Sequence, residues 1–247
     1  MKQTILSIIA LCLYGPAWAG SATIAVAANF TDATRDIVPL FEKATGHTVK
    51  VSFGSTGKLY AQIENGAPFD VFLAADIKRS AKAENTGLAV KGTRLTYAKG
   101  KLVLWSAQPG RFTDGGEFLN TGGFKRLAIA NPKTAPYGIA AQQVMEHLGL
   151  WQSLQPTLVR GDSIAQTFQF VVSGNAQAGF VALSQVRAWK DSQGSLWEIP
   201  EGDYAPIAQQ AVLLKRGQDN PAARAFLTFL KGEEARTVMT RYGYGIQ

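Results

Sequence analysis

The stretch Phe53-Gly54-Ser55-Thr56-Gly57-Lys58-Leu59 marks the end of one strand and the start of the helix that follows it. A similar junction, Ala27-Ala28-Asn29-Phe30-Thr31-Asp32, lies about one strand-helix-strand unit earlier in the chain. A helix begins with backbone N–H groups that have no partner inside the helix, and these groups attract anions. Two such helix starts close together therefore predict a cradle for a small anion.

The apolar segments around these junctions predict an α/β protein, because strands alternate with helices along the chain. The first series of strands and helices occupies residues 23–27, 31–45, 49–53, 58–65 and 70–75. The second series occupies residues 127–130, 137–148, 157–160, 164–172 and 178–183. Pro39 falls inside the helix over 31–45, and we expect a kink or a local break there.

Two long stretches of strand character predict how the chain is divided into lobes. Residues 95–105 exceed the usual length of a strand, which favours a segment that leaves one sheet and enters another, and residues 207–215 form a second long strand. Two α/β halves joined by two crossings enclose a cleft, where such sheets bind ligands. We expect a leader over 1–19, one lobe over 20–101 plus 205–247, and a second lobe over 102–204.

The N-terminal residues have the features of a secretory signal peptide. A positive start, an apolar run over residues 5–13 and the small-x-small sequence Ala17-Trp18-Ala19 predict cleavage before Gly20. The single cysteine, Cys12, lies inside this leader, so the mature protein has no disulfide and no cysteine ligand for a metal. No later apolar stretch approaches the length needed to span a membrane.

Composition and charge exclude some classes of partner. The chain is 46% hydrophobic and 17% charged, which is typical of a globular protein. Its formal net charge of +7 becomes +6 when Lys2 is removed with the leader (7 − 1 = 6). The basic residues are scattered, and no basic run interleaved with aromatic residues indicates a nucleic-acid surface. We therefore expect no nucleic-acid partner.

Known catalytic and metal-binding patterns do not fit this sequence. Phe53 stands where a nucleophile elbow around Ser55 would have glycine, and Leu59 stands where a P-loop would have Ser or Thr. His47 and His147 are the only histidines, and neither belongs to a cluster with carboxylates that would ligate a metal. We expect no enzymatic activity, no cofactor and no directly bound metal ion.

Several segments together resemble the periplasmic molybdate-binding proteins of ABC transporters. These segments are residues 27–30, 53–57, 65–68 with 70–72, 131–132 with 135–138, and 179–183. They occur in the family's order over nearly all of the chain that follows the leader. The resemblance implies a two-lobed periplasmic binding protein of type II, a monomer whose lobes close on molybdate or the similarly sized tungstate. It also implies a location in the periplasm and delivery of the oxyanion to a membrane permease.

The resemblance also implies which residues hold the oxyanion. Asn29 stands where the family has Ser or Asn at the first helix start, and Thr56 stands at a serine position and keeps the hydroxyl. Tyr137 falls where members have Ala or Tyr, and Ile164 falls where a valine contributes its backbone N–H. We therefore expect these four residues to bind the oxyanion.

Three further positions bear on this set of oxyanion-binding residues. Ala28 and Ser55 are secondary candidates because they adjoin the first two ligand positions. Ala182 departs from relatives that carry a ligand-contacting tyrosine there. The phenol of Tyr137 is a candidate to replace that tyrosine from across the cleft, and whether Tyr137 contacts the ligand by its side chain or its backbone stays open.

The chemistry of the ligand agrees with these residue types. A fully deprotonated tetrahedral dianion only accepts hydrogen bonds, so a complementary site needs donors and no carboxylate. Phosphate keeps a proton near neutral pH and needs an acceptor, which an inward-facing Asp162 would supply. Sulfate lacks that proton, so only the size of the cavity would exclude it.

Two alternatives belong to other classes of protein. The sensor half of a LysR-type regulator shares this general fold, but the leader and the lack of a DNA-binding region argue against it. A binding protein for sulfate, thiosulfate, phosphate or ferric iron is the main alternative. Ferric-iron binders use paired tyrosines, and Tyr242 and Tyr244 lie together, but in a C-terminal tail and not at a helix start.

Overall fold

The first of two sheets is built from the N-terminal strands and one late strand. The computed structural model of the protein describes residues 19–190 and 194–246, so residues 1–18 of the predicted leader, Cys12 among them, lie outside the described residues. The strand order of the first sheet is β2 (Thr48–Gly54), β1 (Ser21–Ala27), β3 (Val71–Ala74), β10 (Ile207–Leu213) and β4 (Leu95–Gly100). β1 pairs in parallel with β2 and β3, whereas β10 runs antiparallel to β3 and β4.

The second sheet repeats this plan with the middle of the chain. Its order is β7 (Leu158–Gly161), β6 (Leu127–Ala130), β8 (Ala178–Ala182), β5 (Leu102–Ser106) and β9 (Ser195–Glu198). β6 pairs in parallel with β7 and β8, and β5 runs antiparallel to β8 and β9. Both sheets are thus mixed, and the predicted α/β class is confirmed.

Helices cover both faces of each sheet. The first sheet has α1 (Thr31–Thr45), α9 (Pro221–Phe229) and α10 (Glu233–Arg241) on one face and α2 (Thr56–Glu64) and α3 (Ile77–Asn85) on the other. The second sheet has α4 (Gly115–Thr121), α5 (Pro136–His147) and α6 (Trp151–Leu154) on one face and α7 (Ile164–Val172) and α8 (Leu183–Ala188) on the other. Short 3-10 turns are η1 (Ala28–Phe30), η2 (Gln155–Thr157) and η3 (Lys215–Gly217).

This layering explains why the central strands are apolar throughout. Successive side chains of a strand point to opposite faces, and here both faces are covered. In β1, Ile24 and Val26 pack in the same core as Phe41 of α1, whereas Ala25 packs with Leu59 of α2. Within the described residues, no helix is long and apolar enough to cross a membrane.

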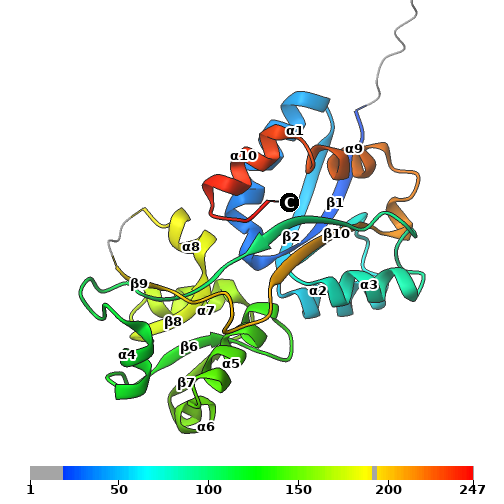
Figure 1. Cartoon of the computed structure of the whole chain (residues 1–247). Helices are drawn as coiled ribbons and strands as arrows, with labels where there is room; N and C mark the ends of the chain where they lie inside the picture. The colour runs from blue at the N-terminus through cyan, green and yellow to red at the C-terminus, as the bar shows by residue number, and fades with distance from the viewer. Residues whose placement is uncertain (1–18, 191–193, 247) are drawn as a thin grey trace, which may run out of the picture.

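The chain passes between the sheets twice: the long stretch over 95–105 contains the first crossing, as predicted, whereas β10, in the second long stretch, lies wholly in the first sheet. β4 ends at Gly100 in the first sheet and β5 begins at Leu102 in the second, so Lys101 alone separates them. The chain returns through residues 199–206, between β9 and β10. Figure 1 shows these green and orange segments running between the upper lobe and the lower lobe. The exact lobe boundaries given above stay a prediction.

Of the kink or local break expected at Pro39, the break is wrong, because α1 continues from Thr31 to Thr45 through this residue, and the kink stays a prediction. Proline removes one helical N–H, which leaves the carbonyl of Arg35 without its donor. Pro39 and Arg35 are both exposed, so water can hydrogen-bond that carbonyl. The apolar side of α1, with Ile37 and Phe41 buried, holds the helix against the sheet across the proline.

We predict that Pro39→Ala raises the free energy of unfolding by about 1–3 kcal/mol, because it restores a helical hydrogen bond inside α1. Pro221→Ala is the matched control: Pro221 stands in the first turn of α9, where its N–H would have no helical partner, so the change should be close to zero. Urea denaturation of both variants measures the two effects. Equal effects of the two substitutions would contradict this interpretation of Pro39.

Candidate functional site

The six residues expected at the site come together around one small cavity between the lobes. The residues lining it are Ala27, Ala28, Asn29, Ser55, Thr56, Ala75, Ala135, Pro136, Tyr137 and Ile164. All of them are buried except Pro136, which is half-buried. The cavity volume is about 10 Å³, far below the roughly 300–1,000 Å³ of pockets for drug-sized ligands. The cavity therefore suits a ligand of few atoms, and the binding role of each residue stays a prediction.

The four main candidates each stand at the start of a helix that follows a strand. Asn29 lies in η1 directly after β1, Thr56 opens α2, and Ile164 opens α7. Tyr137 is the second residue of α5, after Pro136, which has no N–H to offer. Because first-turn N–H groups lack a partner inside their helix, the four starts bring donors and positive helix-dipole ends to one place.

The neighbouring hydroxyl groups of Ser55 and Thr56 differ in their hydrogen bonds. Thr56 Oγ1 accepts a hydrogen bond from the N–H of Ala75 at 3.1 Å, so its own hydrogen remains free to donate. Ser55 Oγ is buried and has no hydrogen-bond partner among the described residues, although Ser55 is the N-cap of α2. A buried hydroxyl without a partner costs about 1–3 kcal/mol. Ser55 is thus a donor held in the cavity wall at a cost to stability.

The side chain of Asn29 points away from this donor set. Its Nδ2 donates to Gln209 Oε1 at 2.9 Å and to the Tyr244 hydroxyl at 3.2 Å. Both N–H bonds of the amide are therefore used inside the protein. Of the two groups that Asn29 could offer a ligand, its backbone and its side chain, this arrangement favours the backbone N–H.

Tyr137 reaches the same internal network. Its hydroxyl accepts a hydrogen bond of 3.4 Å from Gln209 Nε2. Burial raises the pKa of Tyr137 and also that of Tyr97 and Tyr244. All three phenols therefore stay protonated and uncharged at neutral pH, and each carries one hydrogen to donate.

Sequence reasoning missed the residues behind Asn29. The C-terminal tail brings Tyr244 to the first helix start, where its hydroxyl donates to the Asn29 carbonyl at 2.6 Å. Ser184 of α8 also donates to that carbonyl, at 3.0 Å. One signal was available: Gln209 alternates with Ile207 and Ala211 on the buried side of an apolar strand, which marks it as a polar residue inside the core.

The nearby carboxylates face away from the cavity. Asp162, whose side chain is 69% exposed, pairs with Lys58 Nζ at 2.8 Å. Asp76 caps α3 by accepting from the N–H of Arg79, and Asp70 accepts from the N–H of Thr23. The residues that line the cavity thus offer hydrogen-bond donors and no negative charge.

Direct contacts join the lobes beside the cavity. The N–H of Gly57 in α2 donates to the carbonyl of Thr134, before α5, at 2.8 Å. Arg79 Nη2 donates to the carbonyl of Lys133 at 3.3 Å. The ion pair of Lys58 with Asp162 also crosses the cleft, but exposed pairs contribute only about 0–1 kcal/mol. In this structure, residues of the two lobes are therefore in direct contact beside the cavity.

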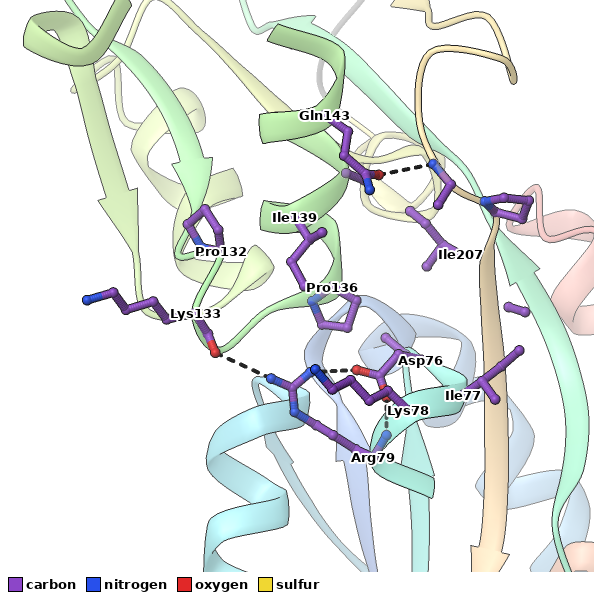
Figure 2. A pocket seen from close by; sticks show the side chains of 15 residues that line it. Asp76, Ile77, Lys78, Arg79, Pro132, Lys133, Pro136, Ile139, Gln143 and Ile207 are labelled. Atoms are coloured by element: carbon purple, nitrogen blue, oxygen red, sulfur yellow. Dashed lines mark hydrogen bonds and ion pairs between the residues drawn. The ribbon is translucent and has the colours of Figure 1, made fainter. Parts of the chain in front are cut away.

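A wider groove adjoins the cavity and shares Ala75 and Pro136 with it. Figure 2 shows Ile139 and Pro136 of α5 on one side of this groove and the start of α3 on the other. Ile77 and Ile139 are 47% and 41% exposed in it. The buried atoms without partners that the described chain contains lie outside this groove. The small cavity is therefore the stronger candidate for a ligand site.

The described residues also limit which metal sites are possible. In residues 19–190 and 194–246, no group of three or more His, Cys, Asp or Glu side chains could hold a metal ion.

Comparisons with known proteins agree with the geometry of the two lobes. Residues 22–245 match the family model described as bacterial extracellular solute-binding protein. The chain is 53% identical to the molybdate-binding protein ModA of Azotobacter vinelandii over 100% of its own length and 98% of the relative's. It is 52% identical to ModA of Rhodobacter capsulatus, covering 93% of this chain and 90% of that one. The solved Azotobacter vinelandii periplasmic molybdate-binding protein superposes with a TM-score of 0.88 at 43% identity, covering 92% of this chain and 99% of that one.

We predict that Gly57→Ala opens the cleft while leaving each lobe folded. An added Cβ would lie 2.9 Å from the Thr134 carbonyl oxygen and 3.0 Å from Arg79 Nη2, so the lobes must separate to accommodate it. The backbone of Gly57 is helical, where alanine is preferred over glycine, so the melting temperature should hold or rise. Small-angle scattering of both proteins with a saturating oxyanion, which favours the closed cleft, should show a larger radius of gyration for the variant than for wild type. An unchanged radius would contradict a role of Gly57 in closure.

Proposed function

We infer that this chain, which belongs to the family of bacterial extracellular solute-binding proteins, binds molybdate as the solute receptor of an ABC transporter. The relatives that are more than half identical to it over nearly their full length are molybdate-binding proteins. Their family is named for binding a solute and not for a reaction, and the chain is no enzyme.

One observation on the site supports this function most strongly: the cavity is lined by donors, among them the unpartnered Ser55 hydroxyl, and by no carboxylate. Molybdate is a dianion whose four oxygens only accept hydrogen bonds. Each hydrogen bond to a charged group contributes about 1.5–3 kcal/mol. Several such bonds exceed the roughly 8 kcal/mol of micromolar binding after the cost of association.

We assign the oxyanion contacts to groups from both lobes. The backbone N–H groups of Asn29, Tyr137 and Ile164 and the hydroxyl of Thr56 form the main set. Ser55 and the backbone of Ala28 are the secondary donors. Because the set combines both lobes, the ligand bridges them and favours closure.

The proposal also covers a second ligand, tungstate, the compartment in which the protein works and its transport partner. Tungstate presents the same four acceptors at nearly the same size, so the same donors suit it. We propose a periplasmic receptor that works as a monomer and delivers the oxyanion to the membrane permease of its ABC transporter. The signal-peptide features of the first residues support export from the cytoplasm.

The alternatives find less support in the site. Phosphate would need an acceptor for its proton, and Asp162 points outward. A ferric site would need paired tyrosines, but Tyr242 donates to Asp36 and Tyr244 to the Asn29 carbonyl. Sulfate fits the donor chemistry, so its discrimination depends on size.

We predict that calorimetric titration of the ligand-free protein at neutral pH gives tight one-to-one binding of molybdate and tungstate. Sulfate and phosphate should give no measurable heat at the same concentrations. Ligand should also raise the melting temperature, because it binds only the folded protein. Sulfate binding as tight as molybdate binding would keep the receptor and overturn the proposed substrate.

We predict that Ser55→Ala weakens molybdate binding about 10- to 100-fold, the loss of one hydrogen bond to a charged group. The same change should leave the stability of the ligand-free protein unchanged or raise it, because the hydroxyl has no partner to lose. Ser80→Ala is the matched control, since Ser80 is equally buried but donates to the carbonyl of Gln210 at 3.3 Å. It should lower stability and keep the affinity. A Ser55→Ala variant with wild-type affinity would remove Ser55 from the ligand set.

A further inference from the structure

The buried amide of Gln209 lies behind the cavity on the strand that returns to the first lobe. Gln209 is 0% exposed and belongs to β10, two residues after that strand begins. The pairing of β10 with β4 shifts register between Gln209 and Gln210. Such irregularities re-aim side chains next to functional sites. Gln209 and Gln210 are adjacent on the strand, so their side chains point to opposite faces of the sheet and lie in different environments.

Gln209 contacts one cavity residue from each lobe. Its Oε1 accepts from Asn29 Nδ2 and from the Tyr97 hydroxyl, each at 2.9 Å, both on the first lobe. Its Nε2 donates to the hydroxyl of Tyr137, on α5 of the second lobe, at 3.4 Å. Asn29 and Tyr137 both line the cavity. One amide thus connects the two walls of the site from behind.

The crossing strand leaves room for this connection. A Cβ at Gly100 would lie 2.6 Å from Gln209 Nε2 and would collide with the Tyr137 hydroxyl. The contact between Tyr137 and Gln209 therefore requires that residue 100 has no side chain. Gly100 is also the last residue of β4, where the chain leaves the first lobe.

The donation from Gln209 also orients the phenol of Tyr137. Since the Tyr137 oxygen accepts from Nε2, the phenol hydrogen is directed to another acceptor. Both N–H bonds of Asn29 are likewise directed inward, which fixes the peptide of Asn29 in the cavity wall. The amide of Gln209 therefore sets the geometry of one cavity residue in each lobe.

We propose that Gln209 is a positioning residue that couples lobe closure to the affinity for the oxyanion, through its simultaneous contacts with Asn29 and Tyr137. This inference rests on the proposed function for the identity of the ligand. A purely structural amide would change the stability of the first lobe and leave the affinity of the folded protein alone. A coupling amide changes the affinity, and it does so through Tyr137.

The test is a double-mutant cycle in molybdate affinity. Wild type, Gln209→Leu, Tyr137→Phe and the double variant are titrated with molybdate, and the melting temperature of each is measured without ligand. Gln209→Leu should weaken binding about tenfold, within the usual range for coupled sites. The double variant should bind no more weakly than the weaker single variant, since both substitutions break the same contact. Gln209→Met, whose flexible side chain fills a similar volume, replaces Gln209→Leu if that variant does not fold.

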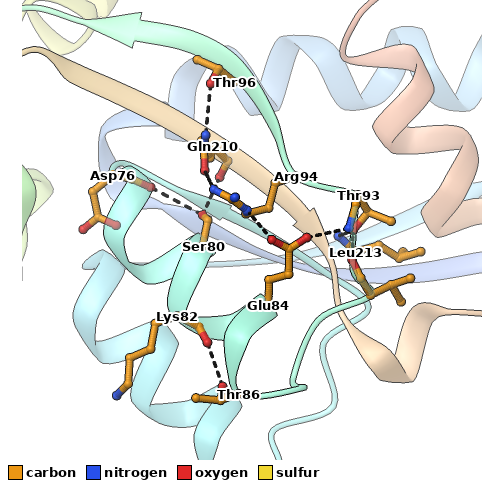
Figure 3. Close-up of polar contacts among 12 residues, drawn as sticks. Asp76, Ser80, Lys82, Glu84, Thr86, Thr93, Arg94, Thr96, Gln210 and Leu213 are labelled. Carbon is orange, nitrogen blue, oxygen red and sulfur yellow. Dashed lines mark hydrogen bonds and ion pairs between the residues drawn. The ribbon is translucent and has the colours of Figure 1, made fainter.

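The neighbouring glutamine provides the matched control. Gln210 lies one residue further along β10, donates to Thr96 Oγ1 at 3.2 Å and accepts from Arg94 Nη1 at 3.1 Å. Figure 3 shows that these bonds join β10 to the segment around β4, within the first lobe. Gln210→Leu should lower the melting temperature and keep the affinity for molybdate.

The outcomes separate this inference from the proposed function. Loss of affinity in Gln209→Leu together with non-additivity in the cycle supports the coupling role. Wild-type affinity in Gln209→Leu, or losses that multiply in the double variant, overturns it while molybdate binding by wild type stands. A wild-type protein that does not bind molybdate overturns the proposed function, and the inference that rests on it.

Discussion

The starts of four helices, with the backbone N–H groups of their first turns, surround one buried cavity that no carboxylate lines, and the rest of the structure serves this arrangement. These groups have no acceptor inside their own helices, and the hydroxyl of Ser55 beside them has none either. Buried donors without partners destabilise a closed cleft. An anion that accepts from all of them removes this cost. Binding of the anion therefore favours the closed cleft, and closure of the cleft favours binding of the anion.

The topology of the two sheets produces this convergence. β1 and β2 of one sheet and β6 and β7 of the other each lead at their carboxyl ends into a helix start that lines the cavity. Two crossings of the chain hold the sheets together, and the second delivers Gln209 behind the site. The polar groups around the ligand thus fall into two sets. The first set consists of the backbone and hydroxyl donors of the residues that line the cavity. The second set is an uncharged network of amides and phenols behind the cavity, which holds Asn29 and Tyr137 in place.

Much of the fold could be predicted from the periodic spacing of apolar residues. The helices that were not predicted have few apolar residues at that spacing. The central strands and the helices α1, α2, α5 and α7 have buried apolar faces, and all were expected close to their observed limits. α3 and α10 were not expected, because α3 buries only Ser80 and Ala83 and α10 is mostly polar. The lining of the cavity could be anticipated because helix starts have local signatures. The support of Asn29 by Tyr244 could not, since it joins positions 215 residues apart.

The most direct test of this account is a crystal structure of the protein grown with molybdate, with the metal located by its anomalous scattering. We predict a single molybdenum peak in the cavity, with oxyanion oxygens within hydrogen-bond distance of the Ser55 and Thr56 hydroxyls and of the backbone N–H of Ile164. A peak in the neighbouring groove between Ile77 and Ile139, or an acidic side chain turned toward the ion, would contradict a site built from uncharged donors.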